Sequence, residues 1–202
     1  VMETKTGHIK AISNLGRAND GSYYETQNYA ITESHEPGST FKLVDLIAVL
    51  DDKKADTSKI YDSKGGVIEY YGRKVRDSKP GGYGKISLAR GFELSSNTVL
   101  VQSVYDSYKN NPKQFVDRIN SYGLNKPLGL PRKGEGKPVI PQPGTNRWSG
   151  VALPWMAFGY GLSVTPLQTL TLYNAVANDG VMIKPIFVSE IKEWNKTIKK
   201  FD

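Results

Sequence analysis

The chain has 202 residues, of which 38% are apolar and 23% charged. This suffices for one domain with a buried core, and no run of about 18 apolar residues predicts a transmembrane helix. The chain has no cysteine, which excludes disulfides, thiolate metal sites and a cysteine nucleophile, and only His8 and His35 could act as imidazole bases. The net charge of +7 is spread along the chain without interleaved aromatic residues, so we interpret it as solvated surface charge and expect no nucleic-acid partner.

The first quarter of the chain predicts a hairpin, a loop and a buried helix. Apolar residues on either side of the turn at residues 4–7 predict the hairpin. Residues 14–30 are polar and rich in Gly and Asn, which predicts a loop. The apolar run that follows predicts a largely buried helix from about Ser39 to Asp52, entered through the turn Pro37-Gly38.

The middle of the chain predicts short strands followed by helices. Residues 57–84 alternate Gly, Lys and Tyr, which is typical of short strands or an extended surface excursion. Three helices are expected from apolar spacing and terminal signals, over residues 86–94, from Asn97 through Tyr105, and over residues 112–122.

The last third predicts a long loop, a well-capped helix and two strands. Residues 125–150 are rich in Pro and Gly, which predicts an irregular loop. Thr165-Pro166-Leu167-Gln168 combines a capping residue, a proline at the first helical position and a glutamine that can bond back to the cap. Strands are predicted over residues 181–188 and 189–194.

The first candidate for chemistry is the pair Ser39 and Lys42. Positions three apart lie on one face of a helix, so the hydroxyl and the amine can meet. A serine hydroxyl needs a base to take its proton, and a lysine can do so only when neutral, a form that burial among apolar groups favours. Because the pair follows Pro-Gly and begins an apolar helix, it predicts a nucleophile and its base, although surface Ser/Lys pairs at this spacing are common.

The second candidate is Ser95-Ser96-Asn97, between two predicted helices. Ser95 could relay a proton between Lys42, Ser39 and a leaving amine. Asn97 could offer N–H to a substrate carbonyl and its C=O to Lys42. A plain helix cap is the structural alternative, since Ser and Asn are favoured cap residues.

Together the two motifs resemble the S-x-x-K and S-x-N pair of penicillin-binding proteins and serine β-lactamases. Residues 36–42 resemble the nucleophile segment of the class B penicillin-binding proteins. Residues 122–124, 159–168 and 174–185 are similar to further segments of that class, and the likeness is greatest to its cell-division transpeptidases. The resemblance implies an α+β transpeptidase fold in which an antiparallel sheet packs against helices, with residues 1–202 forming a partial domain.

The third motif of this family, Lys-Thr/Ser-Gly, is expected to be absent. Lys5-Thr6-Gly7 has the right letters, but it precedes the nucleophile and lies in the predicted turn. In the family the motif follows the segment where this chain stops. We therefore expect a chain truncated before that motif and incomplete at its C-terminus, impaired or inactive when alone.

The resemblance implies a serine D,D-transpeptidase of peptidoglycan synthesis that needs no metal or organic cofactor. Its ligands would be peptidoglycan stem peptides and β-lactam antibiotics, and its partners cell-division or elongation proteins. It would lie on the outer face of the cytoplasmic membrane, with the anchor outside this chain. The alternatives are a class D-like β-lactamase, a β-lactam sensor or inactive penicillin-binding module, and a generic polyanion binder based on charge.

Overall fold

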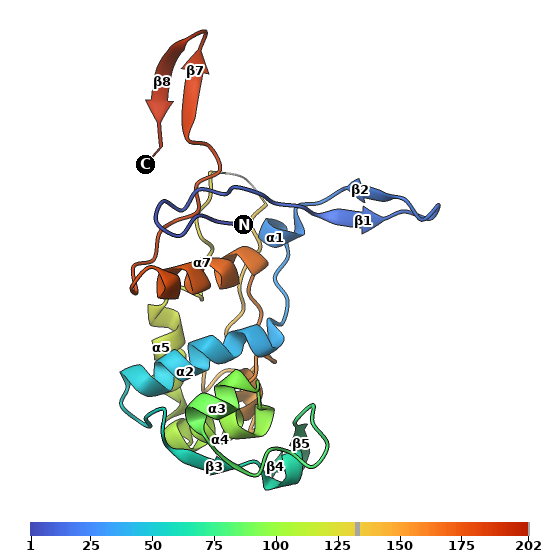
Figure 1. The fold of residues 1–202 in the computed structure, drawn as a ribbon, viewed down its shortest axis with the longest axis vertical. Coiled ribbons are helices and arrows are strands. Elements are labelled where there is room, and N and C mark those ends of the chain that lie inside the picture. Colours follow the sequence, from blue (N-terminus) through green and yellow to red (C-terminus); the bar gives the residue numbers. More distant parts are fainter. Residues whose placement is uncertain (132–133, 202) are drawn as a thin grey trace. The chain divides into compact units, whose positions relative to one another are not determined.

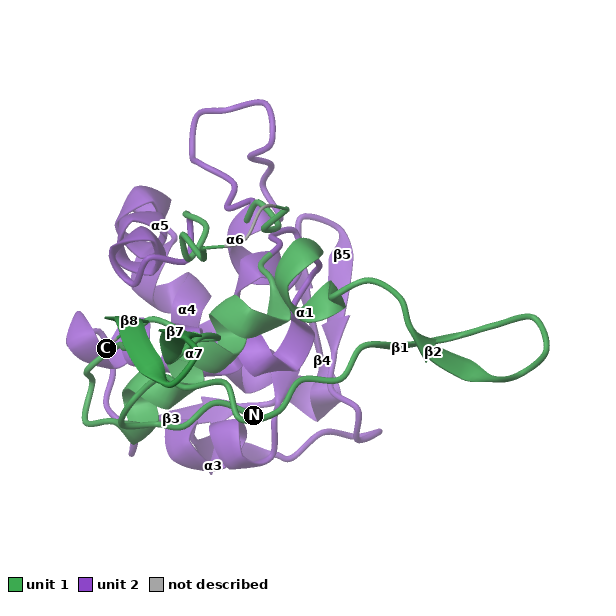
Figure 2. Ribbon diagram, turned by 90° about the horizontal axis from the view of Figure 1, so that it is seen from above, with its two compact units in different colours: residues 1–34, 126–138, 164–202 green, residues 35–125, 139–163 purple. Residues whose placement is uncertain are grey.

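The computed structural model describes residues 1–131 and 134–201 and divides into two compact units (Figure 2). Unit 1 comprises Val1–Ser34, Lys126–Pro138 and Val164–Asp202, and unit 2 comprises His35–Asn125 and Val139–Ser163. Each unit is thus assembled from segments that are distant in the sequence. All four candidate site residues lie in unit 2.

Unit 2 is built around the helix α2, Lys42–Asp51, which the short 3₁₀ helix η1, Gly38–Phe41, precedes directly (Figure 1). The helices α3, α4 and α5 pack against α2, and α6 packs against α4. Their bounds are Leu88–Glu93 for α3, Asn97–Tyr108 for α4, Pro112–Ser121 for α5 and Ala152–Met156 for α6. The core consists of apolar side chains from these helices, among them Phe41, Val44, Ala48, Val49, Val99, Leu100, Val104, Phe115, Ile119 and Met156.

The strands of unit 2 form two antiparallel pairs. β3, Ile60–Asp62, pairs with β6, Lys85–Ser87, and β4, Val67–Tyr70, pairs with β5, Arg73–Arg76. A 3₁₀ turn, η2, covers Lys64–Gly66. Among these strands Val75 and Tyr61 are buried. The second pair ends directly before Asp77, a residue that matters for the site.

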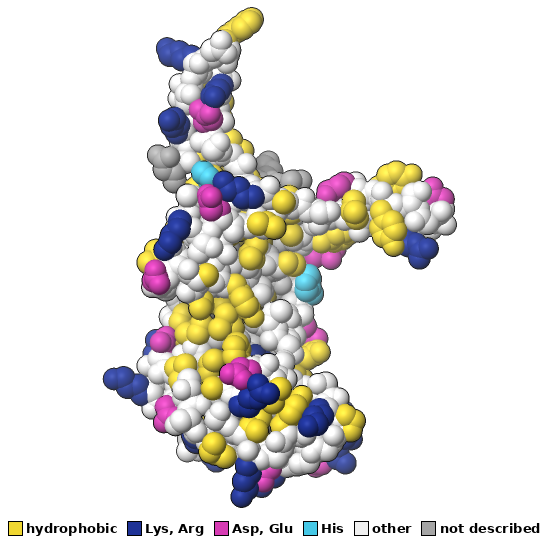
Figure 3. Space-filling view, in the orientation of Figure 1, with side chains coloured by type: hydrophobic (Ala, Val, Ile, Leu, Met, Phe, Trp, Pro, Cys, Tyr) yellow, Lys and Arg dark blue, Asp and Glu magenta, His cyan; other side chains and the backbone are white. Residues whose placement is uncertain are grey.

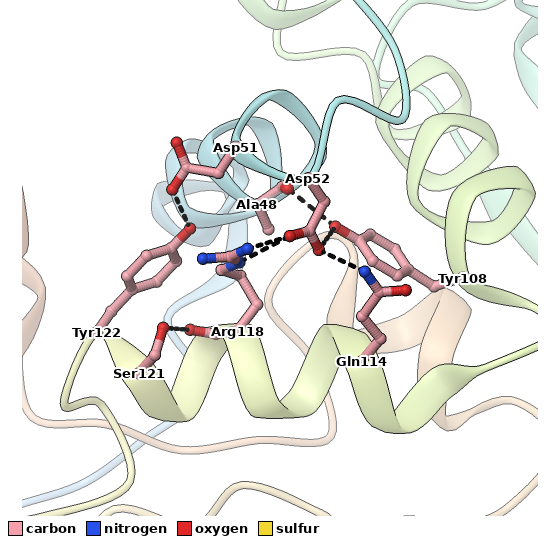
Figure 4. A network of polar contacts seen from close by, with 8 residues as sticks. All are labelled: Ala48, Asp51, Asp52, Tyr108, Gln114, Arg118, Ser121 and Tyr122. Atoms are coloured by element: carbon pink, nitrogen blue, oxygen red, sulfur yellow. Dashed lines mark hydrogen bonds and ion pairs between the residues drawn. The ribbon is translucent and has the colours of Figure 1, made fainter.

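The C-terminal end of α2 is fixed by a polar network (Figure 4). The Asp52 carboxylate accepts hydrogen bonds from the Arg118 guanidinium, from the Tyr108 hydroxyl at 2.8 Å and from the Gln114 amide at 3.3 Å. Tyr108 also contacts the Ala48 carbonyl at 2.9 Å. The network therefore joins α2 to α4 and α5.

Unit 1 contains the helices α1, Tyr29–Thr32, and α7, Pro166–Ala177, which pack against one another. Ile31 and Leu167 are buried there together with Leu130. Two antiparallel hairpins complete the unit: β1, Leu15–Arg17, with β2, Tyr23–Glu25, and β7, Glu190–Glu193, with β8, Lys196–Lys200 (Figure 1).

The sequence predictions hold for most elements of the fold. The α+β class with antiparallel pairing is confirmed, as is the N-terminal hairpin, in which Met2 pairs with Ile9. The helix beginning at Ser39 is confirmed with a 3₁₀ first turn, and the helix at Thr165 carries the full capping box. In the described part of residues 125–150 there is no helix or strand, as expected for the loop.

Three predictions are corrected. Residues 14–30 are not a loop throughout but contain β1, β2 and the beginning of α1. Both strands are largely exposed, so no alternating apolar pattern marks them. Residues 181–188 are not a strand, since Pro185 interrupts them and only Ile186 makes a bridge, to His8. The helix predicted over residues 86–94 begins later, because residues up to Ser87 belong to β6.

The surface agrees with a dispersed positive charge. Figure 3 shows Lys and Arg side chains scattered over the face in view, with Asp and Glu among them. Within residues 1–131 and 134–201, no helix combines the length and the apolar character needed to cross a bilayer.

Candidate active site

The backbone around Ser39 is held in place by a glycine-containing segment of the same unit. The Gly38 N–H donates to the Gly159 carbonyl at 3.0 Å, and the Gly161 N–H donates to the Glu36 carboxylate at 2.8 Å. A Cβ on Gly159 would lie 2.0 Å from the Gly38 oxygen, so only glycine fits there. Ser39 itself is exposed, which leaves its hydroxyl accessible to a substrate.

Lys42 is buried and binds the second motif. Only 1% of the residue is exposed, and its Nζ donates to the Ser95 carbonyl at 2.6 Å and to the Ser95 hydroxyl at 3.0 Å. Two positions 53 residues apart are thus brought together. The Lys42 backbone N–H donates to the Ser39 carbonyl, but among the described residues no hydrogen bond joins the Lys42 amine to the Ser39 hydroxyl. The amine is directed to Ser95, and Ser39 lies one helical turn before it.

Burial makes the Lys42 amine a weaker proton acceptor than an ordinary lysine. Desolvation lowers the pKa of Lys42 to about 8, against the opposing influence of the Asp77 and Asp45 carboxylates. Because an amine acts as a base only when neutral, this environment is what the sequence argument required of the residue.

Ser95 lies in a tight connection between α3 and α4. A Cβ on Gly91 would come within 2.4 Å of Val99, so glycine permits the close approach of the two helices. Ser95 has a φ of +52°, a left-handed conformation that is uncommon outside glycine and that occurs at functional sites. The helix cap is supplied by Ser96, whose hydroxyl accepts from the Val99 N–H. The cap and the contact to Lys42 therefore belong to different serines.

Asp77 is a residue that sequence reasoning missed. Its carboxylate accepts from the Ser96 hydroxyl at 3.0 Å, from the Thr98 N–H at 2.9 Å and from the Thr98 hydroxyl at 2.8 Å. It thereby holds the connection that carries Ser95 and also acts electrostatically on Lys42. The sequence offered only an acidic residue within the stretch 57–84, for which short strands or an extended surface excursion were expected.

Asn97 lies in the first turn of α4 and is partly buried. Its side-chain N–H donates to the Arg76 carbonyl at 2.6 Å. The expected contact between the Asn97 carbonyl and Lys42 is not among the hydrogen bonds of the described residues. Asn97 and Asp77 together attach the second motif to the end of β5.

Lys5-Thr6-Gly7 lies in unit 1, in the predicted turn. The Gly7 N–H donates to the Glu3 carbonyl at 2.9 Å, and Lys5 pairs with the exposed Asp179 at 3.5 Å. The three residues thus take part in ordinary turn and surface interactions.

The site offers acid–base chemistry without an evident metal centre. Across the described ranges, no group of three or more His, Asp or Glu side chains is placed to hold a metal ion. What the arrangement provides is an exposed hydroxyl, a buried amine of lowered pKa and a second hydroxyl bound to that amine. Groups of this kind can support acyl transfer with a serine nucleophile and a lysine base.

Comparisons with known proteins agree with this chemistry. The chain is 29% identical over 92% of its length to penicillin-binding protein PbpB of Mycobacterium tuberculosis, covering 27% of that protein. It is 27% identical over 95% of its length to peptidoglycan D,D-transpeptidase FtsI of Escherichia coli, covering 32% of it. The crystal structure of penicillin-binding protein 3 from Mycobacterium tuberculosis, complexed with aztreonam, matches with 27% identity and a TM-score of 0.70, over 85% of this chain and 36% of that one.

The chain thus spans about a third or less of these relatives' length. The family model described as the penicillin-binding protein transpeptidase domain matches residues 1–201. Since that match covers nearly the whole sequence, the chain belongs to the penicillin-binding protein transpeptidase domain family.

Proposed function

We propose that residues 1–202 are part of a serine D,D-transpeptidase domain that cross-links peptidoglycan stem peptides and is acylated by β-lactams. The observation that carries the proposal is the contact of the buried Lys42 amine with Ser95. Lys42 itself lies one helical turn after the exposed Ser39. Family membership and the name of the Escherichia coli relative support the reaction class.

In the proposed reaction Ser39 is the nucleophile and Lys42 its base. The Ser39 oxygen attacks the carbonyl carbon of the penultimate D-Ala, and its proton passes to the neutral Lys42 amine. The C–N bond to the terminal D-Ala then breaks, and the leaving amine receives the proton through Ser95. With a pKa of about 8, roughly one Lys42 amine in ten is neutral at pH 7.

The second half of the reaction regenerates the serine. The amine of a neighbouring stem peptide attacks the acyl-enzyme ester, forms the new amide bond and returns the proton to Ser39. Asn97 is proposed to orient the substrate from the start of α4. The N–H of Ser39, at the beginning of a helical segment, is proposed to stabilise the developing oxyanion.

The same proposal sets the location and partners of the protein. Peptidoglycan lies outside the cytoplasmic membrane, so the domain would act on the outer face of that membrane, within the cell envelope. Cell-division or elongation proteins are its proposed partners, as the family resemblance of the sequence implies.

The proposal is tested by intact mass after incubation with benzylpenicillin. The wild type is expected to gain one penicillin mass, Ser39→Ala none, and Ser149→Ala, which removes another exposed serine of unit 2, the same mass as the wild type. Labelling of Ser39→Ala would contradict the assignment of the nucleophile.

A second measurement separates the reaction classes. Transfer of the acyl group from a stem-peptide thioester analogue to a D-amino acid supports a transpeptidase. Rapid hydrolysis of the penicilloyl-enzyme would instead indicate a β-lactamase. A stable acyl-enzyme with no transfer to any amine would indicate a sensor or an inactive module.

A further inference from the structure

The proposed reaction leaves one buried acidic group of unit 2 unused. Asp45 lies in the first turn of α2, is 0% exposed, and neither of its carboxylate oxygens has a hydrogen-bond partner within the described structure. An ionisable side chain held in this way is costly to bury unless another charge interacts with it. Its position therefore calls for a physical explanation.

Lys42 is a charged residue on the same face of α2 as Asp45. The two residues are three apart on α2, a spacing that places side chains about 5–6 Å from each other on one face of a helix. Both are buried, Lys42 being 1% exposed. In a buried environment two opposite charges attract each other over distances at which water would screen them.

Only carboxylates that make no hydrogen bond to the Lys42 amine oppose the cost of burying its charge. Its amine is bound to the carbonyl and hydroxyl of Ser95, which are both neutral groups. Of the two carboxylates that act on the amine, Asp77 has the larger effect, and its oxygens are hydrogen-bonded to Ser96 and Thr98. Asp45 has the smaller effect. The Asp45 oxygens are not used in this way.

The other charged groups around α2 are engaged elsewhere. The charged groups on or next to α3, α4 and α5, which pack against α2, have partners of their own. Three ion pairs form within these segments: Arg90 with Glu93, Lys109 with Asp106, and Lys113 with Asp117. Arg118 and Tyr108 interact with Asp52 at the end of α2. Lys42 is the charge that acts on the Asp45 carboxyl.

We propose that Asp45 is a positioning residue that sets the charge state of Lys42 through the protein interior. When ionised, the Asp45 carboxylate favours the ammonium form, so it delays the loss of the Lys42 proton and raises the pH at which the amine becomes available to Ser39. The converse also applies, because desolvation raises the pKa of Asp45 well above its ordinary value while the Lys42 charge opposes that rise. This inference rests on the proposed role of Lys42 as base.

The first test does not depend on the reaction. The side-chain resonances of Lys42 next to the amine are titrated by NMR from pH 5 to 11 in the wild type and in Asp45→Asn, and assigned by their absence in Lys42→Met. Removal of the carboxylate is expected to lower the apparent pKa of Lys42 by about one unit, as for an opposite charge lost from its vicinity. An unchanged titration in Asp45→Asn would overturn the proposal, whether or not the protein reacts with penicillin.

The second test asks whether the effect reaches Ser39. The rate of acylation by benzylpenicillin is expected to rise with pH, and in Asp45→Asn this rise should occur about one pH unit lower, so that the variant reacts several-fold faster than wild type at pH 6. A variant that is merely damaged would be slower at every pH, which would contradict the proposal. Asp52→Asn, at the other end of the same helix, is the matched control and should keep the wild-type pH profile.

Discussion

The buried charged side chains at the two ends of α2 differ in their hydrogen-bond partners. At the C-terminal end, the side chain of Asp52 is 4% exposed and accepts hydrogen bonds from the Arg118 guanidinium, Tyr108 and Gln114 (Figure 4). At the N-terminal end, the Lys42 amine has only neutral partners, and both Asp45 oxygens have none among the described residues. The same helix thus carries one carboxylate with charged and polar donors and one buried carboxyl without hydrogen-bond partners among the described residues.

The pKa shifts follow the same division. Burial raises the pKa of Asp52, but hydrogen bonds from Arg118 and Tyr108 outweigh it and hold the pKa below the ordinary value. For Lys42 desolvation prevails and lowers the pKa to about 8. A buried charge that is hydrogen-bonded to an opposite charge stabilises one geometry, whereas a buried charge whose hydrogen-bond partners are all neutral is more easily lost. The environment of Asp52 suits a residue that connects helices, and the environment of Lys42 suits a general base.

The largest expected effect comes from removing the base at the N-terminal end. Lys42→Met keeps the length and apolar character of the side chain but cannot accept a proton. We expect the acylation rate by benzylpenicillin to fall by about 10³-fold, as for loss of a general base. Stopped-flow or quenched mass spectrometry measures the rate, and circular dichroism verifies the fold. A rate within threefold of wild type would refute Lys42 as the base.

Disrupting the polar network at the C-terminal end of α2 should lower stability and leave the acylation rate unchanged. Arg118→Ala leaves the Asp52 carboxylate buried with fewer donors, so the free energy of unfolding should fall by about 3 kcal/mol. Urea titration followed by tryptophan fluorescence measures it. Below the unfolding midpoint the acylation rate should remain that of wild type. Loss of acylation in a folded variant would show that the two ends are not independent.

The Asp52 network also predicts a loss of stability in acid. Because the folded-state pKa of Asp52 lies below its unfolded value, its contribution is present above about pH 4 and is lost as pH falls through the folded pKa. The difference in free energy of unfolding between wild type and Arg118→Ala should therefore shrink between pH 5 and pH 2. A difference that stays constant over that range would show that ionised Asp52 is not what Arg118 stabilises.

The sequence was sufficient where the interactions are local. The helix beginning at Ser39, the spacing to Lys42 and the capping box at Thr165 depend on residues within four positions of each other, and all three were predicted. The burial of Lys42 followed from the apolar character of the same helix. The contact with Ser95 was inferred from the family resemblance, because no local pattern joins positions 53 residues apart.

The parts that could not be predicted depend on contacts between distant segments. Asp77 lies at the end of a strand whose pairing had to be known before its proximity to Ser96 and Thr98 could be inferred. The requirement for glycine at position 159 arises from the Gly38 carbonyl, 121 residues away by number (159 − 38). The orientation of Asn97 toward Arg76 likewise follows from the β4–β5 pair and not from its own sequence neighbourhood.

The smallest expected effect is a difference in stability between two tyrosine variants, one in the buried part and one at the exposed edge of the polar network at the C-terminal end of α2. Tyr122→Phe removes a hydrogen bond to the exposed Asp51, 3.0 Å long, whereas Tyr108→Phe removes bonds to Asp52 and to the Ala48 carbonyl from a side chain that is 1% exposed. Water can replace the lost partner at Asp51 but not at Asp52. We therefore expect a loss of about 0.5 kcal/mol in the free energy of unfolding for Tyr122→Phe and about 2 kcal/mol for Tyr108→Phe. Equal losses in the urea titrations of the two variants would mean that burial does not determine what this end of α2 contributes to stability.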